Sequence, residues 1–224
     1  EYRGLLFVQP EKLHQIARLV LRKGLQLTAH AQGDGAILNL VEAYEKVNRE
    51  FSVKDARPCV SHGSFMSLEA IDKMRQLGVV ADLQPAWLER DGATLLEQFG
   101  NDRLRYFHPY KTLAERGVVV GGGSDHMQKI GSMRSINPYN PFFGMWITLA
   151  RQPRWMKGAL HPEERQTREQ AIRLYTSNNA FLTFEEKEKG SLEAGKLADL
   201  IVLDRDILTC PLDEVKEIGV EQTW

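Results

Sequence analysis

The stretch that decides the fold is PCVSHGSFMSLEAIDKMRQLGVVADL, residues 58–83. Its first apolar run, 58–62, has the length and flanking residues of a strand. Ser67 is placed to cap a helix over 68–77, and Gly78 is placed to end it. The next apolar run, 79–83, predicts a second strand. A strand, a helix and a strand in this order are one unit of a parallel sheet.

The same alternation continues on both sides of this unit. Upstream we expect a helix from Pro10 to Gly24, a strand at 25–30, and a helix over 36–48 with Asp34 as its N-cap. Downstream we expect helices over 94–99 and 110–116 and a strand at 118–122. The four strands begin within fewer than one hundred residues, whereas an eight-unit barrel needs about 250. The chain therefore holds half of such a barrel or most of an open doubly wound sheet, and the pattern does not decide between them.

The last third of the sequence changes character. Helices are predicted over 142–151 and 168–182, the second capped by Thr167. A turn-rich link at 190–196 then leads to β-type runs at 200–203 and 215–220. We place a domain boundary here, with residues 1–188 in the α/β part and residues 189–224 in a small β subdomain.

Composition limits the classes of function. The 224 residues are 42% hydrophobic and 26% charged, with a net charge of −1, which is the balance of a soluble globular protein. There is no basic excess to suggest a nucleic-acid partner. The longest mostly apolar stretch, 142–150, is shorter than the roughly 18 residues of a membrane span. Two cysteines far apart in sequence favour a reduced, cytoplasmic compartment.

Polar side chains end each predicted strand. The strands end at His30, His62, Gln84 and Asp125, and function in parallel α/β folds lies at the carboxyl ends of the strands. Two imidazoles and a carboxylate are suitable ligands for a zinc-like divalent metal. Strand alternation directs Cys59 away from His62, so we exclude it as a ligand.

Each of these residues also has an ordinary structural explanation. A lone histidine is often a partly buried side chain with a backbone partner, and an aspartate after glycines is often a turn cap. Three such explanations would all have to fall on strand ends, which favours the metal site. We interpret the other histidines as surface or supporting residues: His14, His108, His126 and His161.

Six motifs make this chain resemble the amidohydrolase superfamily, specifically its YtcJ-like branch. They occur in the same order and spacing, and the resemblance covers essentially the whole sequence. The motifs are Thr28-Ala29-His30-Ala31-Gln32-Gly33-Asp34, Ser61-His62-Gly63, Leu83-Gln84-Pro85, Gly123-Ser124-Asp125, Tyr175-Thr176-Ser177-Asn178-Asn179-Ala180 and Gly190-Ser191-Leu192-Glu193-Ala194-Gly195-Lys196-Leu197-Ala198-Asp199-Leu200.

The resemblance implies the second half of a TIM (β/α)8 barrel, strands 5–8, followed by part of a small β-sandwich. It puts His30 on strand 5, His62 on strand 6 and Asp125 on strand 8, as ligands of one or two divalent ions, zinc above all. The family's strand-1 His-x-His pair and strand-4 ligand would lie upstream of Glu1, and this sequence contains no His-x-His. We therefore expect a fragment of a longer chain, in which the metal could be absent.

The activity implied is hydrolysis of an amide-type or formamide-type C–N bond in a small molecule. Asp125 would act as general base and then general acid, and Gln84, Trp87 and Arg103 are weaker candidates for lining the substrate pocket. The alternative is a non-catalytic piece that only folds or self-associates. Because an isolated half barrel has open sheet edges, a homodimer is one expected partner arrangement.

Overall fold

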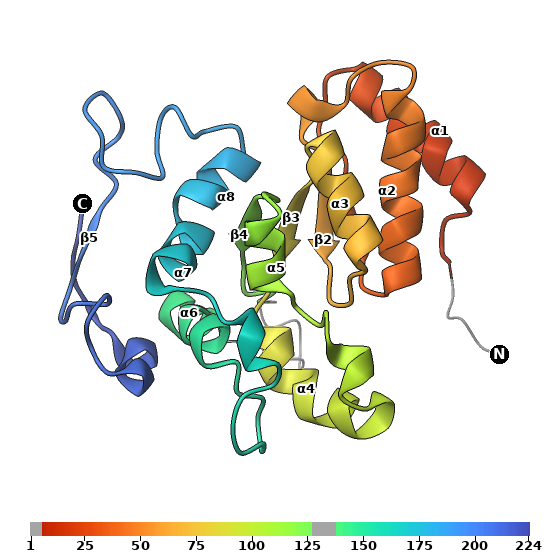
Figure 1. The fold of residues 1–224 in the computed structure, drawn as a ribbon. Helices are drawn as coiled ribbons and strands as arrows, with labels where there is room; N and C mark the ends of the chain where they lie inside the picture. Colours follow the sequence, from red (N-terminus) through yellow and green to blue (C-terminus); the bar gives the residue numbers. More distant parts are fainter. Residues whose placement is uncertain (1–5, 127–137) are drawn as a thin grey trace, which may run out of the picture. The chain divides into compact units, whose positions relative to one another are not determined.

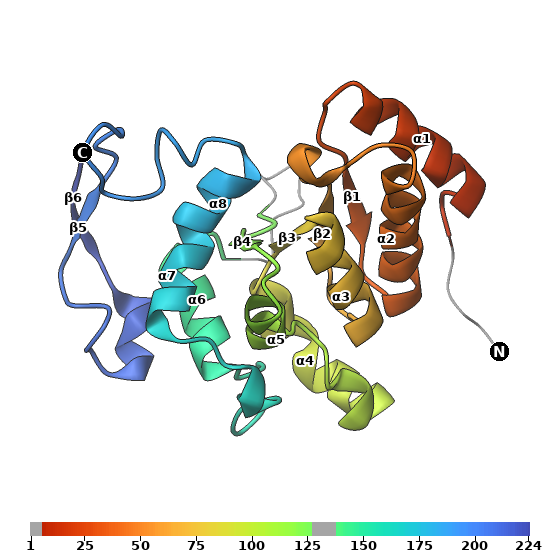
Figure 2. The same cartoon turned by 45° about the horizontal axis from the view of Figure 1, so that its top comes forward.

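The computed structural model describes residues 6–126 and 138–224, which group into two compact units (Figures 1 and 2). Unit 1 combines Glu1–Asp82 with Leu113–Val119, and unit 2 combines Leu83–Thr112 with Val120–Trp224. The predicted domain boundary between residues 188 and 189 lies inside unit 2 and stays a prediction. In the part of the chain described, no helix is both long and apolar enough to cross a bilayer.

Unit 1 is a parallel sheet with its helices packed in sequence order. Strand β1 pairs with β2, and β2 pairs with β3, in both cases in parallel. Helix α2 packs between α1 and α3, as Figure 1 shows. The elements that begin in this unit are α1 (Pro10–Arg22), β1 (Thr28–Ala31), α2 (Asp34–Asn48), η1 (Lys54–Ala56), β2 (Cys59–His62), α3 (Leu68–Leu77) and β3 (Val80–Leu83).

The core of unit 1 lies between the sheet and α2. Val60 and Ala81 stand at the same level of neighbouring strands and are fully buried. The Tyr44 hydroxyl donates to the backbone carbonyls of Leu27, at 3.1 Å, and Cys59, at 3.2 Å. Burial raises the pKa of Tyr44 far above its ordinary value, so this hydroxyl remains a donor that ties α2 to both strands.

Hydrogen bonds place the strands in sequence order. In unit 1 the Ala81 N–H donates to the Val119 carbonyl, at 3.0 Å. In unit 2 the Gly123 N–H donates to the carbonyl of Leu83, the last residue of β3, at 3.0 Å. The order of the sheet is therefore β1-β2-β3-β4, with β4 formed by Val120–Gly122.

Unit 2 is mostly helical. Helix α6 contacts α4, α7 and the short helix η4, while α7 and α8 both contact β4. Besides β4, the elements are α4 (Ala86–Phe99), η2 (Asp102–Leu104), α5 (Tyr110–Glu115, which crosses into unit 1), α6 (Pro141–Ala150), η3 (Pro162–Glu164), α7 (Arg168–Tyr175), α8 (Ser177–Leu182), β5 (Ile201–Leu203), η4 (Leu212–Glu217) and β6 (Val220–Thr223).

Several predicted elements match the structure closely, and their caps explain why. Ser67 accepts from the Ala70 N–H at the start of α3, and Gly78 ends that helix in the left-handed conformation. Thr167 and Gln170 form a reciprocal capping box at the start of α7. All four predicted strands are present, although β1 begins at Thr28 and β4 at Val120, both later than expected.

Other predictions about elements were wrong. Helix α4 begins at Ala86, directly after Pro85, eight residues earlier than predicted, because proline is well tolerated at a helix start. Asp34 is the first residue of α2 and not its N-cap, which is Gly33. The helix predicted over 168–182 is broken at Thr176, whose backbone has φ −127° and ψ −98°.

The C-terminal segment also differs in part from the prediction. Residues 212–217 form the 3-10 helix η4 instead of a strand, because Val215 and Ile218 are both buried at a spacing of three residues. The Trp146 indole N–H donates to Asp213, at 3.1 Å, and so ties η4 to α6. The strand partner of β5 is β6, which pairs with it antiparallel.

Two neighbouring asparagines of α8 hold the backbone of β4. The Asn179 side chain accepts from the Gly122 N–H, at 3.1 Å, and donates to the Gly122 carbonyl, at 3.0 Å. Asn178 donates to the Val120 carbonyl, at 2.8 Å. A Cβ at Gly121 would lie 2.3 Å from Asn179 Oδ1, so glycine is needed for this close approach. The asparagine amides thus provide hydrogen-bond partners for the backbone of the strand that leads to Asp125.

We predict that Asn179→Ala lowers the free energy of unfolding by about 1–3 kcal/mol, because it leaves two backbone groups of Gly122 without their partner. Asn178→Ala is the matched comparison and loses one hydrogen bond, so about 1 kcal/mol is expected. Urea unfolding followed by circular dichroism measures both values. Equal losses of unfolding free energy in the two variants would contradict the assignment of two hydrogen bonds to Asn179 and one to Asn178.

Candidate active site

Unit 1 brings two of the predicted metal ligands together. His30 is on β1 and His62 ends β2, and their ring centroids are 4.3 Å apart with the planes tilted by 58°. His30 is exposed and His62 is half-buried. Two imidazoles this close can share one metal ion, since a zinc–nitrogen bond is about 2.0–2.1 Å long.

Strand alternation does not explain this pairing. His30 stands level with Ser61 on the neighbouring strand, so a regular strand would direct His62 to the opposite face from His30. The backbone of His62 instead adopts φ +72°, in the left-handed region. That turn redirects the imidazole toward His30. Strand alternation therefore does not give the face of the sheet on which the His62 side chain lies.

The residues level with His30 form a polar row. Ser61 stands beside His30, and Asp82 stands beside Ser61 on β3, with Ser61 Oγ 3.4 Å from Asp82 Oδ2. Sequence reasoning passed over Asp82, although a carboxylate inside the apolar run 79–83 was a signal. Burial, helped by the charge of Asp82, raises the pKa of Cys59 to about 12, so its thiol stays protonated at neutral pH.

Unit 2 brings Asp125 together with Trp87. The Trp87 indole N–H donates to Asp125 Oδ2, at 3.1 Å, and joins the first turn of α4 to the residues after β4. The Asp125 backbone is left-handed, at φ +51°, and its side chain is exposed. An aspartate tolerates this conformation better than most residues. The carboxylate therefore has a fixed donor on one oxygen.

The other two predicted pocket residues lie in different settings within unit 2. Gln84 is buried, and its backbone carbonyl accepts from the Trp87 N–H, at 3.2 Å, at the start of α4. Arg103 is exposed on η2. Their roles toward a substrate stay predictions, as does the convergence of the histidine pair with Asp125.

Within residues 6–126 and 138–224, no three or more His, Cys, Asp or Glu side chains are grouped so that they could hold a metal ion. Of the predicted ligands, the structure brings together the histidine pair, with ring centroids 4.3 Å apart.

Comparison with known protein families shows to which family this chain belongs. The model of the amidohydrolase family matches residues 3–224, nearly the whole chain. The chain belongs to the amidohydrolase family. The predicted resemblance is therefore confirmed.

Individual amidohydrolases extend the comparison. The N-substituted formamide deformylase of Arthrobacter pascens is 32% identical over 99% of this chain and 39% of its own length. YtcJ of Bacillus subtilis is 27% identical over 91% of this chain and 37% of its own length. A crystal structure of an uncharacterized metal-dependent hydrolase from Pyrococcus furiosus superposes with a TM-score of 0.73 at 25% identity, covering 93% of this chain and 39% of that one. The amidohydrolase chain thus spans about two fifths of the length of these relatives.

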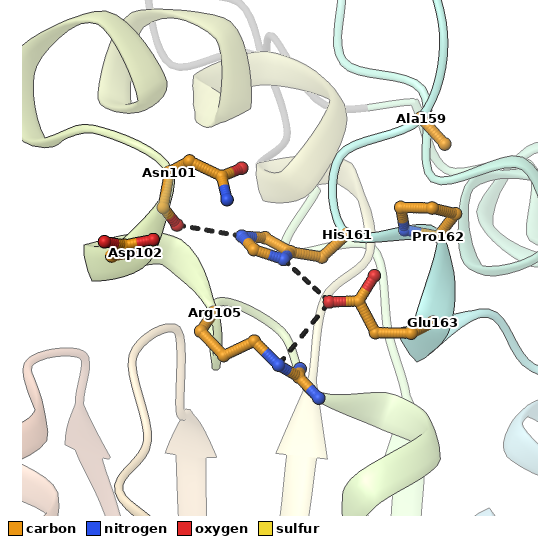
Figure 3. Close-up of a pocket in the computed structure, with 7 residues that line it drawn as sticks. All are labelled: Asn101, Asp102, Arg105, Ala159, His161, Pro162 and Glu163. Atoms are coloured by element: carbon orange, nitrogen blue, oxygen red, sulfur yellow. Dashed lines mark hydrogen bonds and ion pairs between the residues drawn. The ribbon is translucent and has the colours of Figure 1, made fainter.

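A second polar site in unit 2 of this amidohydrolase is a pocket of about 440 Å³ (Figure 3). His161 lies at its centre, with Nδ1 2.9 Å from a Glu163 oxygen and Nε2 2.9 Å from the Asn101 carbonyl. Arg105 approaches Glu163 at 3.4 Å. The polar side chains at this wall are engaged with one another, which indicates a structural role.

Two of the remaining histidines are buried and not at the surface, which leaves the supporting role as the prediction for them. His108 is fully buried, packed edge-on against Phe107, and His161 is only 7% exposed. Behind the pocket the fully buried Arg151 donates to three backbone carbonyls, those of Leu160, His108 and Phe107. Burial lowers the pKa of Arg151 to about 10, which still leaves it charged at neutral pH.

Glu164 anchors this region. Its carboxylate is 1% exposed and accepts from Arg105, at 2.7 Å, and from the backbone and hydroxyl of Thr112. Burial by itself would raise the pKa of Glu164, but the hydrogen bonds from Thr112 and Arg105 outweigh it and hold the pKa below its ordinary value.

We predict that Glu164→Gln lowers the free energy of unfolding by about 1.5–3 kcal/mol at pH 7, the range for hydrogen bonds to charged groups. Because the pKa of Glu164 is depressed in the native state, its contribution is present above the unfolded value of about 4.3 and is lost as pH falls through the native value. Urea titrations at pH 7 and pH 3.5 should show the difference from wild type shrinking at the lower pH.

The matched control is Glu163→Gln, whose side chain is 45% exposed and should cost less than about 1 kcal/mol. A difference between wild type and Glu164→Gln that stays constant with pH would contradict the role given to this carboxylate.

Proposed function

We propose that this chain is the C-terminal part of a metal-dependent amidohydrolase that cleaves a C–N bond of amide or formamide type in a small molecule. The observation that carries the proposal is the His30–His62 pair at adjacent strand ends. The 32% identical relative named for deformylation of N-substituted formamides supports the choice of bond.

The fold that fits this role is the second half of a (β/α)8 barrel, strands 5–8, with residues 189–224 forming part of a β-sandwich. The strand order supports it, because β1-β2-β3-β4 follows the sequence. A doubly wound sheet reverses its strand order at a switch point, and a barrel does not. The remaining barrel strands and metal ligands would come from a longer polypeptide.

The donor set of the histidine pair fits a divalent metal of the zinc type, one or two ions in the complete site. His30 and His62 would each give one ring nitrogen, leaving the other nitrogen for an orienting partner. Asp125 would add an oxygen ligand. A bound ion of this kind polarises a carbonyl group and makes water a stronger nucleophile at neutral pH.

The protein side chains then transfer the proton. Asp125 accepts a proton from the attacking water as the oxygen–carbon bond forms. It returns that proton to the amide nitrogen as the C–N bond breaks, giving a carboxylic acid, or formic acid from a formamide, and an amine. Trp87 orients the carboxylate of Asp125 for this proton transfer through its indole N–H. Gln84 and Arg103 are further candidates for contacting the substrate.

A non-catalytic role is the competing hypothesis. It draws support from the lack of a three-ligand group within the described residues. In that case the chain would only fold, or associate with a second copy through the edge of β1, and the histidine pair would not bind metal.

We predict that zinc binds the chain through the histidine pair. In isothermal titration, His30→Ala and His62→Ala should each weaken zinc affinity by at least about tenfold, since even the loss of a supporting residue costs that much. The control is His14→Ala, a histidine on α1 near Glu50, which should leave the affinity unchanged. Unchanged affinity in both site variants would favour the non-catalytic hypothesis.

We predict that Asp125→Asn lowers kcat for hydrolysis of an N-substituted formamide at least about 100-fold in the full-length enzyme, the low end for a general acid–base group. Asp55→Asn removes an exposed carboxylate on η1 and serves as the control. Amine release measures the rate. An Asp125→Asn enzyme as active as the control would exclude the proton-transfer role.

A further inference from the structure

Unit 2 contains a cavity of about 160 Å³ whose wall includes the residues that precede Asp125 and Trp87 in sequence. Ser124, which precedes Asp125, and Ala86, which precedes Trp87, both line it. Asp125 and Trp87, which the proposed mechanism uses to hold and move the proton, thus each follow directly on a residue of the cavity wall.

The cavity is lined by uncharged residues, and more of its lining surface is apolar than polar. Phe143 and Ile147 of α6 line it together with Ala86 and Tyr175, and Ser124, Tyr139 and Asn140 add polar groups. Among the described residues that line it, none carries a charge. Moving an ammonium, carboxylate or phosphate group from water into a site without a charged partner is strongly unfavourable, so the lining selects an uncharged group.

Glycine fixes the position of one wall. A Cβ at Gly144 would lie 1.9 Å from the Tyr175 hydroxyl oxygen, and a Cβ at Gly122 would lie 3.1 Å from Tyr175 Cε2. The Tyr175 side chain thus packs closely against two glycines: a Cβ at Gly144 would have to displace its hydroxyl, and a Cβ at Gly122 would be crowded against its ring.

The volume sets the size of the group. A cavity of about 150 Å³ lined by aliphatic and aromatic side chains accommodates benzene. The present cavity is of that size, so it matches one six-membered ring.

We infer that this cavity binds a ring-sized, uncharged substituent on the nitrogen of the substrate, so that the substrates are amides or formamides of hydrophobic primary amines. The assignment to the nitrogen side rests on the proposed function, in which Asp125 returns a proton to the leaving nitrogen. The group nearest Asp125 is then the substituent of that nitrogen, and Ala86, Phe143 and Ile147 determine specificity.

The test compares kcat/KM for N-cyclohexylformamide and N-methylformamide in the full-length enzyme. The ratio should be at least about 10, since even one methylene group in a fitted pocket contributes that much. Ala86→Leu fills the cavity and should lower the ratio, whereas Phe143→Ala enlarges it and should shift the preference toward an N-naphthyl substrate. Ala198→Leu makes the same change at an exposed alanine and should leave the ratio unaltered.

A ratio near 1 in the wild type, or a ratio equal in Ala86→Leu and Ala198→Leu, would overturn the inference while leaving the hydrolase proposal intact. If no formamide or amide is cleaved, the proposed function fails. Binding of benzene to the 224-residue chain then tests whether the cavity accepts a ring. Saturation-transfer NMR should then detect benzene with the wild type and Ala198→Leu but not with Ala86→Leu. Equal signals from all three would show that the cavity takes no ring.

Discussion

The left-handed backbone of His62 is the constraint on which the proposed site depends. It turns a side chain that regular alternation would direct away from His30 into contact with it. A non-glycine residue in this conformation costs on the order of 1 kcal/mol or more, so its surroundings must hold it. Two backbone hydrogen bonds just beyond it do so, from Gly63 to the Ala31 carbonyl, at 2.9 Å, and from Phe65 to the Gln32 carbonyl, at 2.8 Å. The pairing of β1 with β2 thus continues past the strand ends and holds the backbone on both sides of His62.

Unit 2 has the same feature, a left-handed residue, just after β4. Asp125 is also left-handed, and its carboxylate is held by the indole of Trp87. The glycines of β4 allow Asn179 to approach closely enough to replace a neighbouring strand. In both units, then, a polar residue that would follow the pleat of a strand is redirected where the strand ends, and the strand itself is anchored by hydrogen bonds.

Sequence predicted the elements whose signals are local. Ser67, Gly78 and Thr167 act through their own helices, and their positions were read correctly. The direction of His62 could not be predicted, because alternation assumes an extended backbone and the residue is not extended. The burial of His108 and His161 depends on contacts with residues far away in sequence. The break at Thr176 and the 3-10 helix at 212–217 could not be predicted for the same reason. The helices on both sides of the break pack against β4, and η4 packs against α6.

The proposed hydrolase requires that His30, His62 and Asp125 bind the same metal ion. Anomalous scattering at the zinc edge can locate that ion in crystals of the full-length enzyme grown with zinc. We expect one peak about 2.0–2.2 Å from a ring nitrogen of each histidine and from an oxygen of Asp125. Peaks that contact the histidine pair and Asp125 separately, or none near either, would contradict it.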